Sequence, residues 1–419
     1  MPPDTDPPSE SPSTPALGLE ARIQAVGESL LDTLDGVLAK IPAAEAGPQK
    51  LAGALGIDKV LASRLLKAMR APDAMTAIHR IPGPDPLRRV LKAAQRVGVD
   101  AALVGAAGES VEAFEKLIRA DIGDRSALGT ILSAWVPEAR SEFETRRKQS
   151  AYRAMSQIKA VGIKVFAETV ILWPNPNGRT IDIIGVKVVH GLHRVRPGVP
   201  VLFTTRGVID GSQTRVPTNL AGEPAGTVDG IVLPEFSTKP VPEFDVEVVK
   251  GTAHYLLRQD ELGVQNAVDL VSCDMVRDAT SRYKLPGGFR RTSFTSSIEI
   301  PSESAQFDLL IHEDLCPNMT PTLRVYDGLA RGKTGGPTSF SDFNLLDLVE
   351  NLESLGTGTR RFGSSKVPRY RDLLAHVLGE VGLDGDRLRG YRVSSEYPIY
   401  GSILTVIIEL EDLPDDSPA

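Results

Sequence analysis

Cysteine is scarce in this chain, with only Cys273 and Cys316 among 419 residues. Two cysteines are too few for a disulfide framework, and this content is typical of a reducing cytoplasm, where we expect the protein. Every apolar run falls well short of the roughly 20 residues that a membrane-spanning helix requires. The first fifteen residues hold six prolines and have neither the basic start nor the apolar core of a signal peptide. We therefore expect a disordered leader over residues 1–17.

Motifs of common enzyme classes are missing or incomplete. The run YDGLARGK at residues 326–333 has three residues between Gly328 and Gly332, whereas a phosphate-binding loop has four, and the following GGP does not favour a helix. The run SQIK at residues 156–159 has the serine–lysine spacing of penicillin-recognising enzymes but none of their other motifs. No G-x-S-x-G sequence occurs. We therefore predict no catalytic residue and no cofactor.

The histidines and cysteines do not form a recognisable metal-binding pattern. His190 and His193 are three residues apart in a predicted strand, where they face opposite sides, and no third ligand follows at a typical spacing. The run HEDLC at residues 312–316 is more typical of solvated residues at a strand end. Cys273 lies in an apolar run, which predicts a small buried side chain. We predict no metal site, while a pocket that joined His190, His193 and His312 would indicate an enzyme.

The most informative segment is residues 48–70, PQKLAGALGIDKVLASRLLKAMR. Its apolar residues recur at helical spacing in two short stretches, from Leu51 to Leu55 and from Val60 to Leu66. Gly56 falls where the first helix must end and the chain must reverse, a position that favours left-handed backbone angles. Asp58 is a good N-cap for a second helix that continues to Arg70. The segment therefore predicts two helices joined by a tight turn.

This pattern resembles bacterial helix-turn-helix and winged-helix transcription regulators, most plainly at Leu51-Ala52, Leu55-Gly56-Ile57 and Ser63-Arg64-Leu65-Leu66. The resemblance covers about two dozen of the 419 residues. The chain differs from these regulators at Ala62, where they usually have a β-branched residue, and at Val60 and Leu61, where they usually have polar residues. The resemblance implies that the second helix enters the major groove of duplex DNA. The alternative is an ordinary helical hairpin.

Positive charge is concentrated around the same segment. Residues 48–96 contain ten Lys/Arg and three Asp/Glu, whereas the whole chain has a net charge of −7. A basic region of this kind is typical of contacts with phosphate groups. The DNA contacts that we predict are Lys59, Ser63 and Arg64 near the base edges, and Lys50, Lys67 and Arg70 on phosphates.

The N-terminal half is predicted to be helical. Amphipathic helices are expected over residues 19–40 and 86–97, with two or three more over residues 101–135. The connector at residues 71–85 contains a Pro-Gly-Pro breaker and has room for a short wing strand. Proline at position 137 favours the start of a long helix. We therefore predict a helix-turn-helix domain over residues 18–136 and a connecting helix over residues 137–161.

After residue 161 the pattern changes to short β-branched and aromatic runs separated by Gly/Pro-rich turns. These runs predict a sandwich- or barrel-like β-rich domain over residues 162–410, followed by an acidic tail at residues 411–419. The predicted strands are 164–173, 180–189, 199–205, 227–233, 244–249, 253–258, 267–273, 296–300, 307–311, 323–326, 391–395 and 402–410. Helices are expected at residues 344–355 and 370–381. Tyrosines in the loop 394–401 are typical of packing and turns, and alternatively of a ligand pocket.

The expected fold class is a multidomain α+β protein with a helical N-terminal half and a β-rich C-terminal half that contains a few helices. The first functional hypothesis is a DNA-binding transcription regulator whose β-rich half senses an unidentified ligand or mediates oligomerisation. A homodimer or higher oligomer is expected because one such motif contacts one half-site. The second hypothesis is an assembly protein that uses the helix pair, through Val60 and Leu61, and the β domain for protein contacts. The third is an enzyme whose site in the β domain leaves no motif.

Overall fold

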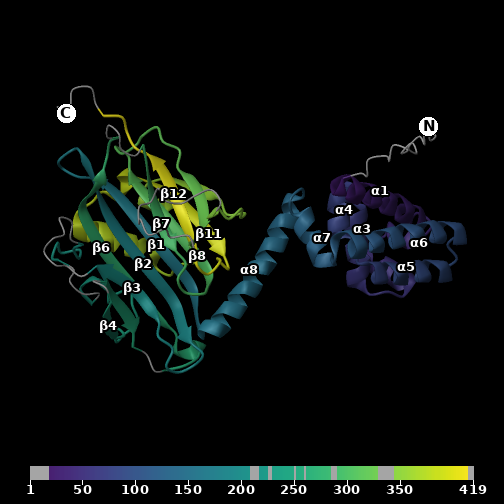
Figure 1. The fold of residues 1–419 in the computed structure, drawn as a ribbon, viewed down its shortest axis with the longest axis horizontal. Coiled ribbons are helices and arrows are strands. Elements are labelled where there is room, and N and C mark those ends of the chain that lie inside the picture. Colours follow the sequence, from purple (N-terminus) through teal and green to yellow (C-terminus); the bar gives the residue numbers. More distant parts are fainter. Residues whose placement is uncertain are drawn as a thin grey trace, which may run out of the picture. The chain divides into compact units, whose positions relative to one another are not determined.

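The computed structural model describes residues 18–207, 217–224, 229–249, 252–258, 261–284, 290–328 and 344–413. The chain forms two compact units, residues 1–143 and residues 144–419, which we call the helical unit and the β unit (Figure 1). The protein is therefore α+β, with helices concentrated in its N-terminal part and strands in its C-terminal part. None of the described helices is both long enough and apolar enough to span a membrane.

The helical unit consists of α-helices joined by short turns. Its elements are α1 (Leu19–Leu38), α2 (Pro48–Leu55), α3 (Lys59–Met69), α4 (Ala74–Arg80), α5 (Pro84–Arg96), α6 (Ala101–Lys116), a π-helical turn (Leu117–Ile122), α7 (Arg125–Leu132) and the start of α8 (Pro137–Lys159). Aspartates cap α3, α4, α6 and α7 by accepting hydrogen bonds from backbone amides of the first turn. Apolar stripes of these helices meet in one core that includes Ile23, Leu34, Leu65, Val90 and Phe114.

The connector between α3 and α5 is helical, so the wing strand considered for residues 71–85 is wrong. The carboxylate of Asp73 accepts a hydrogen bond from the backbone amide of Thr76 at 2.8 Å, and this contact starts α4. Ala77 and Ile78 are buried in the core. The burial of one face of α4 therefore outweighs the turn signals that flank it.

The main sheet of the β unit has six strands in the order β10-β11-β8-β1-β2-β6. Its strands are β1 (Val161–Pro174), β2 (Thr180–Arg194), β6 (Val268–Ser281), β8 (Ser302–His312), β10 (Leu352–Thr357) and β11 (Leu388–Glu396). β1 pairs antiparallel with β2, which confirms the hairpin that the sequence predicts, and it pairs in parallel with β8. β8 is buried along nearly its whole length because both of its faces are covered.

Different layers cover the two faces of the main sheet. Side chains of one face, such as Ala167 and Leu310, pack against α9 (Tyr370–Val381). Side chains of the other face, such as Phe307 and Leu309, pack against the sheet β7-β12-β9. A third sheet, β3-β5-β4, shares a core with the β1–β2 hairpin. The strands of these smaller sheets are β3 (Leu202–Gly207), β4 (Phe244–Val249), β5 (Thr252–Leu257), β7 (Arg291–Ser297), β9 (Thr322–Asp327) and β12 (Ser402–Glu409).

Some predicted elements of the β unit are wrong. The helix expected at residues 344–355 is replaced at its end by β10, which pairs with β11 at the edge of the main sheet. The leucine spacing there fits a helix, but hydrogen bonding to a distant strand decides the conformation. The strand expected at residues 227–233 contains instead a 3₁₀ turn at Asp229–Ile231, and residues 225–228 lie outside the described residues. The strand expected at residues 296–300 lies earlier, as β7.

The long helix α8 begins in the helical unit and ends in the β unit. Lys148 is 7% exposed and forms ion pairs with Glu144, at 3.2 Å, and with Glu350. The side-chain amide of Gln149 donates to the hydroxyl of Tyr397 at 3.0 Å. From residue 144 onward α8 is therefore part of the β unit, and the boundary between the units falls within the predicted connecting helix.

Candidate nucleic-acid interface

The reversal between α2 and α3 has the geometry that the sequence predicts. Gly56 is left-handed, with φ 62° and ψ 38°, and ends α2. The amide of Ile57 then donates to the carbonyl of Ala52 at 3.0 Å. The carboxylate of Asp58 accepts hydrogen bonds from the amides of Val60 at 2.7 Å and Leu61 at 3.3 Å. These contacts confirm the predicted turn and N-cap.

The inner sides of the two helices are packed into the core of the helical unit. Leu51 and Leu55 of α2 are buried, as are Ala62 and Leu65 of α3. α3 lies against α2 and α4. Because one side of α3 is held by these helices, its opposite side remains at the surface.

The DNA contacts predicted on α3 lie on this outer side, and the remaining one, Lys50, belongs to α2. The five cations Lys50, Lys59, Arg64, Lys67 and Arg70 are exposed, and Ser63 is half-buried. Within the described part of the chain, none of the five forms an ion pair with an acid. At 100° per residue, the contacts predicted on α3 fall within about 140° of its circumference, so one face carries them.

A partly buried arginine that the sequence analysis did not single out adds positive charge near Arg64 of α3. Arg125 of α7 donates hydrogen bonds to the carbonyls of Ile78 at 2.7 Å and Ile81 at 3.1 Å, where α4 ends. Burial, together with the nearby charge of Arg64, lowers the pKa of Arg125 to about 10. Arg125 is therefore still a cation at neutral pH. No sequence motif signals this arrangement, because the partners are about fifty residues away.

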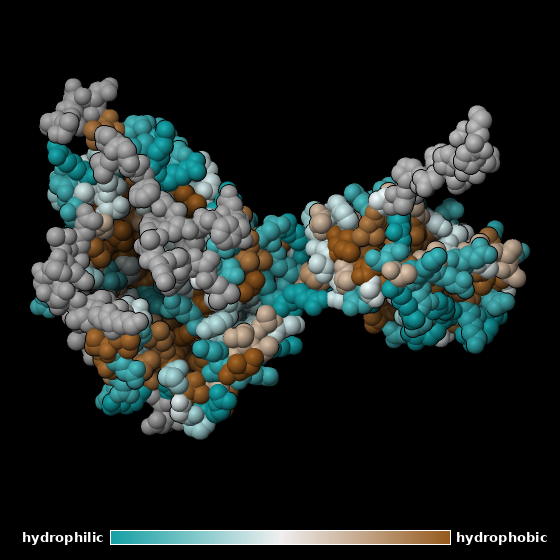
Figure 2. Space-filling model, in the orientation of Figure 1, coloured by the Kyte–Doolittle hydropathy of each residue, from teal (hydrophilic) through white to brown (hydrophobic). Residues whose placement is uncertain are grey.

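Charge in the helical unit is separated rather than in excess. Residues 18–143 contain sixteen Lys/Arg and sixteen Asp/Glu, yet residues 48–96 hold ten of the cations and three of the acids. Some of these cations are neutralised, as Arg88 is by Asp85 and Glu115. Exposed cations remain on α5 at Arg89, Lys92 and Arg96, where Figure 2 shows a hydrophilic surface. Such a segment attracts polyanions although the unit as a whole is neutral.

The structure does not bring His190, His193 and His312 together. His190 of β2 pairs with Val165 of β1, whereas His312 comes directly after Ile311, which pairs with Leu172 of β1. The two histidines therefore lie toward opposite ends of the main sheet. His190 Nδ1 lies 2.8 Å from Asp269 Oδ1. Burial would raise the pKa of Asp269, but hydrogen bonds from His190 and a backbone amide hold it below its ordinary value. Among the described residues, no group of three His, Cys, Asp or Glu side chains could hold a metal ion.

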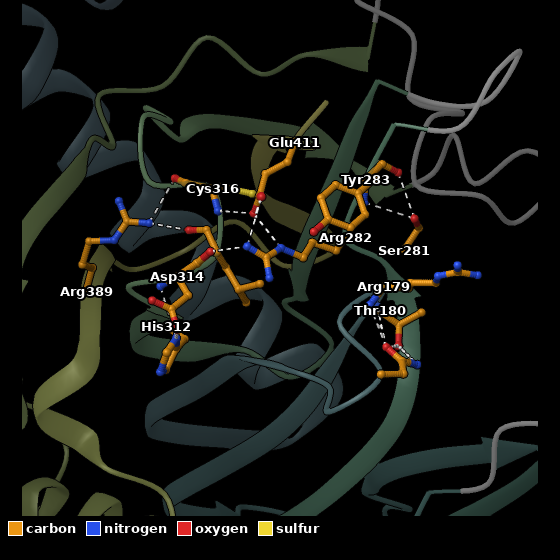
Figure 3. Close-up of polar contacts among 12 residues, drawn as sticks. Arg179, Thr180, Ser281, Arg282, Tyr283, His312, Asp314, Cys316, Arg389 and Glu411 are labelled. Atoms are coloured by element: carbon orange, nitrogen blue, oxygen red, sulfur yellow. Dashed lines mark hydrogen bonds and ion pairs between the residues drawn. The ribbon is translucent and has the colours of Figure 1, made fainter. Parts of the chain in front are cut away.

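The segment at residues 312–316 is solvated only at Glu313 and Asp314, which are exposed as expected, whereas its other three residues are buried, which corrects the expectation for them. His312 is 1% exposed and Cys316 is 3% exposed. Two nitrogens of Arg282 donate hydrogen bonds to the carboxylate of Glu411 at 3.0 and 3.1 Å (Figure 3). The backbone amide of Cys316 donates a third at 2.7 Å. Burial raises the pKa of the Cys316 thiol to about 11, so this thiol is a poor nucleophile at neutral pH. Glu411, the first residue of the predicted acidic tail, is thus anchored, while residues 414–419 lie outside the described residues.

Two loops from the sequence analysis remain. Residues 329–343, which contain most of the glycine-rich run, lie outside the described residues. In the loop at residues 394–401, the ring of Tyr397 packs against that of Tyr152 of α8, with 5.6 Å between ring centroids. Tyr400 of the same loop lines a cavity. The loop therefore serves packing at Tyr397 and a cavity wall at Tyr400.

Comparison with known proteins assigns no family to the chain. No protein-family model and no curated protein matches it. Among solved structures, it is similar to a crystal structure described as that of a "putative protease" from Parabacteroides distasonis ATCC 8503, at 7% sequence identity and a TM-score of 0.25. That match covers 60% of this chain and 40% of the other, so the chain spans less than half the length of that protein. A likeness at this level supports neither a fold assignment nor a function.

Proposed function

We propose that this protein binds duplex DNA through α2 and α3, as a transcription regulator whose β unit senses a ligand or mediates oligomerisation. The observation that carries the proposal is the outer face of α3. There Lys59, Arg64, Lys67 and Arg70 are exposed and form no ion pair within the described part of the chain. A surface helix of a neutral unit normally spreads both signs of charge, so four unpaired cations on one face favour a polyanionic partner.

In this proposal, α3 lies in the major groove, which is wide enough to admit an α-helix. Lys59, Ser63 and Arg64 lie toward the base edges, because recognition helices read bases with their N-terminal residues. Lys67 and Arg70, together with Lys50 of α2, contact phosphates and set the register. The left-handed Gly56 and the cap at Asp58 give α3 a defined starting direction relative to α2.

A dimer is part of the proposal, because a single helix pair contacts only one half-site. The β unit offers an apolar edge for assembly. β4 is the edge strand of the sheet β3-β5-β4, and its Val246, Val248 and Val249 are 51%, 61% and 50% exposed. Figure 2 shows apolar side chains over the part of the β unit where β4 lies. An exposed strand edge of this kind favours association.

The proposal is tested by titrating the full chain with random-sequence duplex DNA at several salt concentrations and measuring fluorescence anisotropy. The binding constant is expected to fall steeply with salt, by about 0.9 log units per log unit of salt for each phosphate contact. A flat salt response, or no binding at low salt, contradicts the proposal.

A second candidate is the assembly protein, which the same exposed valines of β4 and the exposed Val60 favour. In that function the helix pair contacts protein rather than DNA. Light scattering discriminates between the two. Large symmetric particles without DNA affinity support the assembly protein, whereas a dimer that binds DNA supports the regulator.

A further inference from the structure

The β unit contains a cavity of about 450 Å³ where α8 ends and β1 begins. This volume is in the range of roughly 300–1,000 Å³ that is typical of small-molecule sites. Segments far apart in the sequence form its walls: Lys159 and Val161, the residues that lead into β3, the end of β7, and the start of β12. Three segments from the sequence analysis contribute a residue each: Lys159 from the run SQIK, Gly328 from the run YDGLARGK, and Tyr400 from the tyrosine loop. None of them predicted a cavity here.

The walls of the cavity are apolar because their backbone groups already have partners. The amide of Ile298 donates to Ser402 O at 2.9 Å, the amide of Gly401 donates to Ile298 O at 2.8 Å, and the amide of Gly328 donates to Gly401 O at 2.9 Å. A Cβ atom at position 328 would lie 2.2 Å from the carbonyl oxygen of Gly401, so this close approach requires glycine. The remaining surface is mainly aliphatic, from Val161, Val201, Leu202, Ile298, Ile300 and Ile403.

One of the residues that line this apolar cavity is an exposed cation. Lys159 is exposed and ends α8, and its Nζ lies 5.6 Å from the centre of the Tyr400 ring. Within the described part of the chain, Lys159 forms no ion pair. Glu299 also lines the cavity, but it already has interactions inside the protein. Lys159 is therefore a charged group of this cavity that has no ion-pair partner among the described residues.

We propose that this cavity binds a small amphipathic monocarboxylate, with its apolar body against the aliphatic walls and its carboxylate at Lys159. The binding of this ligand does not depend on the proposed function. Only its role as an effector of DNA binding rests on that function. Lys159 ends the helix whose first residues belong to the helical unit, so binding there acts on the element through which the β unit is joined to the DNA-binding helices.

The experiment uses the full chain and decanoate as the probe, with decylamine and acetate as comparison compounds. Isothermal titration calorimetry is expected to show saturable, one-to-one binding of decanoate, and decylamine and acetate are expected to bind at least tenfold more weakly. Lys159→Met keeps the apolar stem but removes the charge, and it is expected to weaken decanoate binding about tenfold, the loss of one charge-assisted contact. Arg153→Ala is the matched control, because Arg153 is an exposed cation of the same helix outside the cavity.

A second variant tests the cavity itself without changing its charge. Ile300→Trp fills the cavity and is expected to abolish binding, and its thermal unfolding without ligand shows whether the variant is folded. Equal decanoate affinity in wild type, Lys159→Met and folded Ile300→Trp overturns the proposal, as does the absence of saturable binding to wild type. DNA binding is measured separately: decanoate binding by a protein that does not bind DNA supports this site and contradicts the proposed function, and the reverse result contradicts this site alone.

Discussion

Arg392 of β11 and Asp308 of β8 form a buried ion pair with two hydrogen bonds. The Nε–Oδ1 distance is 2.8 Å and the Nη2–Oδ2 distance is 2.6 Å, and the side chains are 9% and 0% exposed. The hydroxyl of Tyr370 donates to Asp308 Oδ2 at 2.6 Å, and Arg392 also donates to the carbonyl of Gly363 at 2.6 Å. The pair therefore joins α9 and the loop before it to the main sheet.

Removing one member of this pair leaves an uncompensated buried charge. Arg392→Met is expected to lower the free energy of unfolding of the β unit by about 3–5 kcal/mol, measured by urea denaturation. Arg291→Met is the control, because the pair of Arg291 with Glu409 is exposed and its loss is expected to cost less than about 1 kcal/mol. The single variant Asp308→Asn and the double variant Asp308→Asn/Arg392→Met complete the test. The double variant is expected to lose less free energy of unfolding than the two single variants lose together, and additive losses would contradict this account.

Two glycines, Gly53 within α2 and Gly56 at its C-cap, are expected to respond in opposite ways to substitution by alanine. Gly56 has φ 62°, so Gly56→Ala is expected to destabilise the helical unit by about 1–2 kcal/mol. Gly53 lies inside the helix with nothing within 4 Å of an added Cβ, so Gly53→Ala is expected to stabilise the unit by up to about 1 kcal/mol. Chemical unfolding followed by circular dichroism measures both. A change of the same sign in the two variants is incompatible with the turn described here.

The cations of α3 are expected to differ from other cations of the same unit in DNA binding. Lys67→Ala and Arg70→Ala should each weaken binding and reduce the salt slope by about 0.9, the contribution of one phosphate contact. Lys116→Ala, an exposed cation at the end of α6, should leave the slope unchanged. Anisotropy titrations from low to moderate salt provide the slopes, and equal slopes in all three variants would rule out the proposed phosphate contacts.

A substitution at Val60 separates the two candidate functions, in which this residue contacts either a DNA base or another protein. Its side chain is 66% exposed at the start of α3, where an apolar residue suits the methyl group of thymine. On a site selected from random duplexes, replacing the contacted thymine by deoxyuridine removes one buried methyl, worth about 0.8 kcal/mol, and is expected to weaken binding about fourfold. Val60→Ala, which removes two methyl groups, is expected to weaken binding at least as much. The two changes together should cost no more than one alone. If Val60→Ala instead dissolves large particles and leaves DNA affinity unchanged, Val60 serves assembly.

The cap of α4 predicts a pH dependence of stability. The backbone amide of Thr76, and then its hydroxyl, lower the pKa of Asp73 below its ordinary value. Because the folded pKa is the lower one, the carboxylate stabilises the folded state above the unfolded pKa of about 3.9, and this contribution is lost as the pH falls through the folded pKa. Asp73→Ala is expected to cost about 0.5–2 kcal/mol at pH 7. The difference from wild type in urea denaturation should shrink toward pH 3, and a constant difference would contradict the assignment.

Local signals were sufficient where one segment contains all the partners of a contact. Gly56 and Asp58 are two residues apart and close the α2–α3 turn with amides of neighbouring residues. The β1–β2 hairpin and α9 are likewise local, because their turn and apolar spacing lie within one stretch of sequence. The same reasoning failed at β10, whose helical leucine spacing is overridden by pairing with β11, and at α4, whose flanking turn signals are overridden by burial in the helical core.

The sequence by itself determined the division into helical and β-rich parts, the two-helix turn and the cations of its outer face, because these depend on periodicity, capping and charge order. Only the tertiary structure decided that Arg125 lies near Arg64 of α3, that Arg392 pairs with Asp308, and that Lys159 lines an apolar cavity. Each of these relationships joins residues from separate elements. Such contacts are set by strand pairing and core packing over long sequence separations, which no local pattern records.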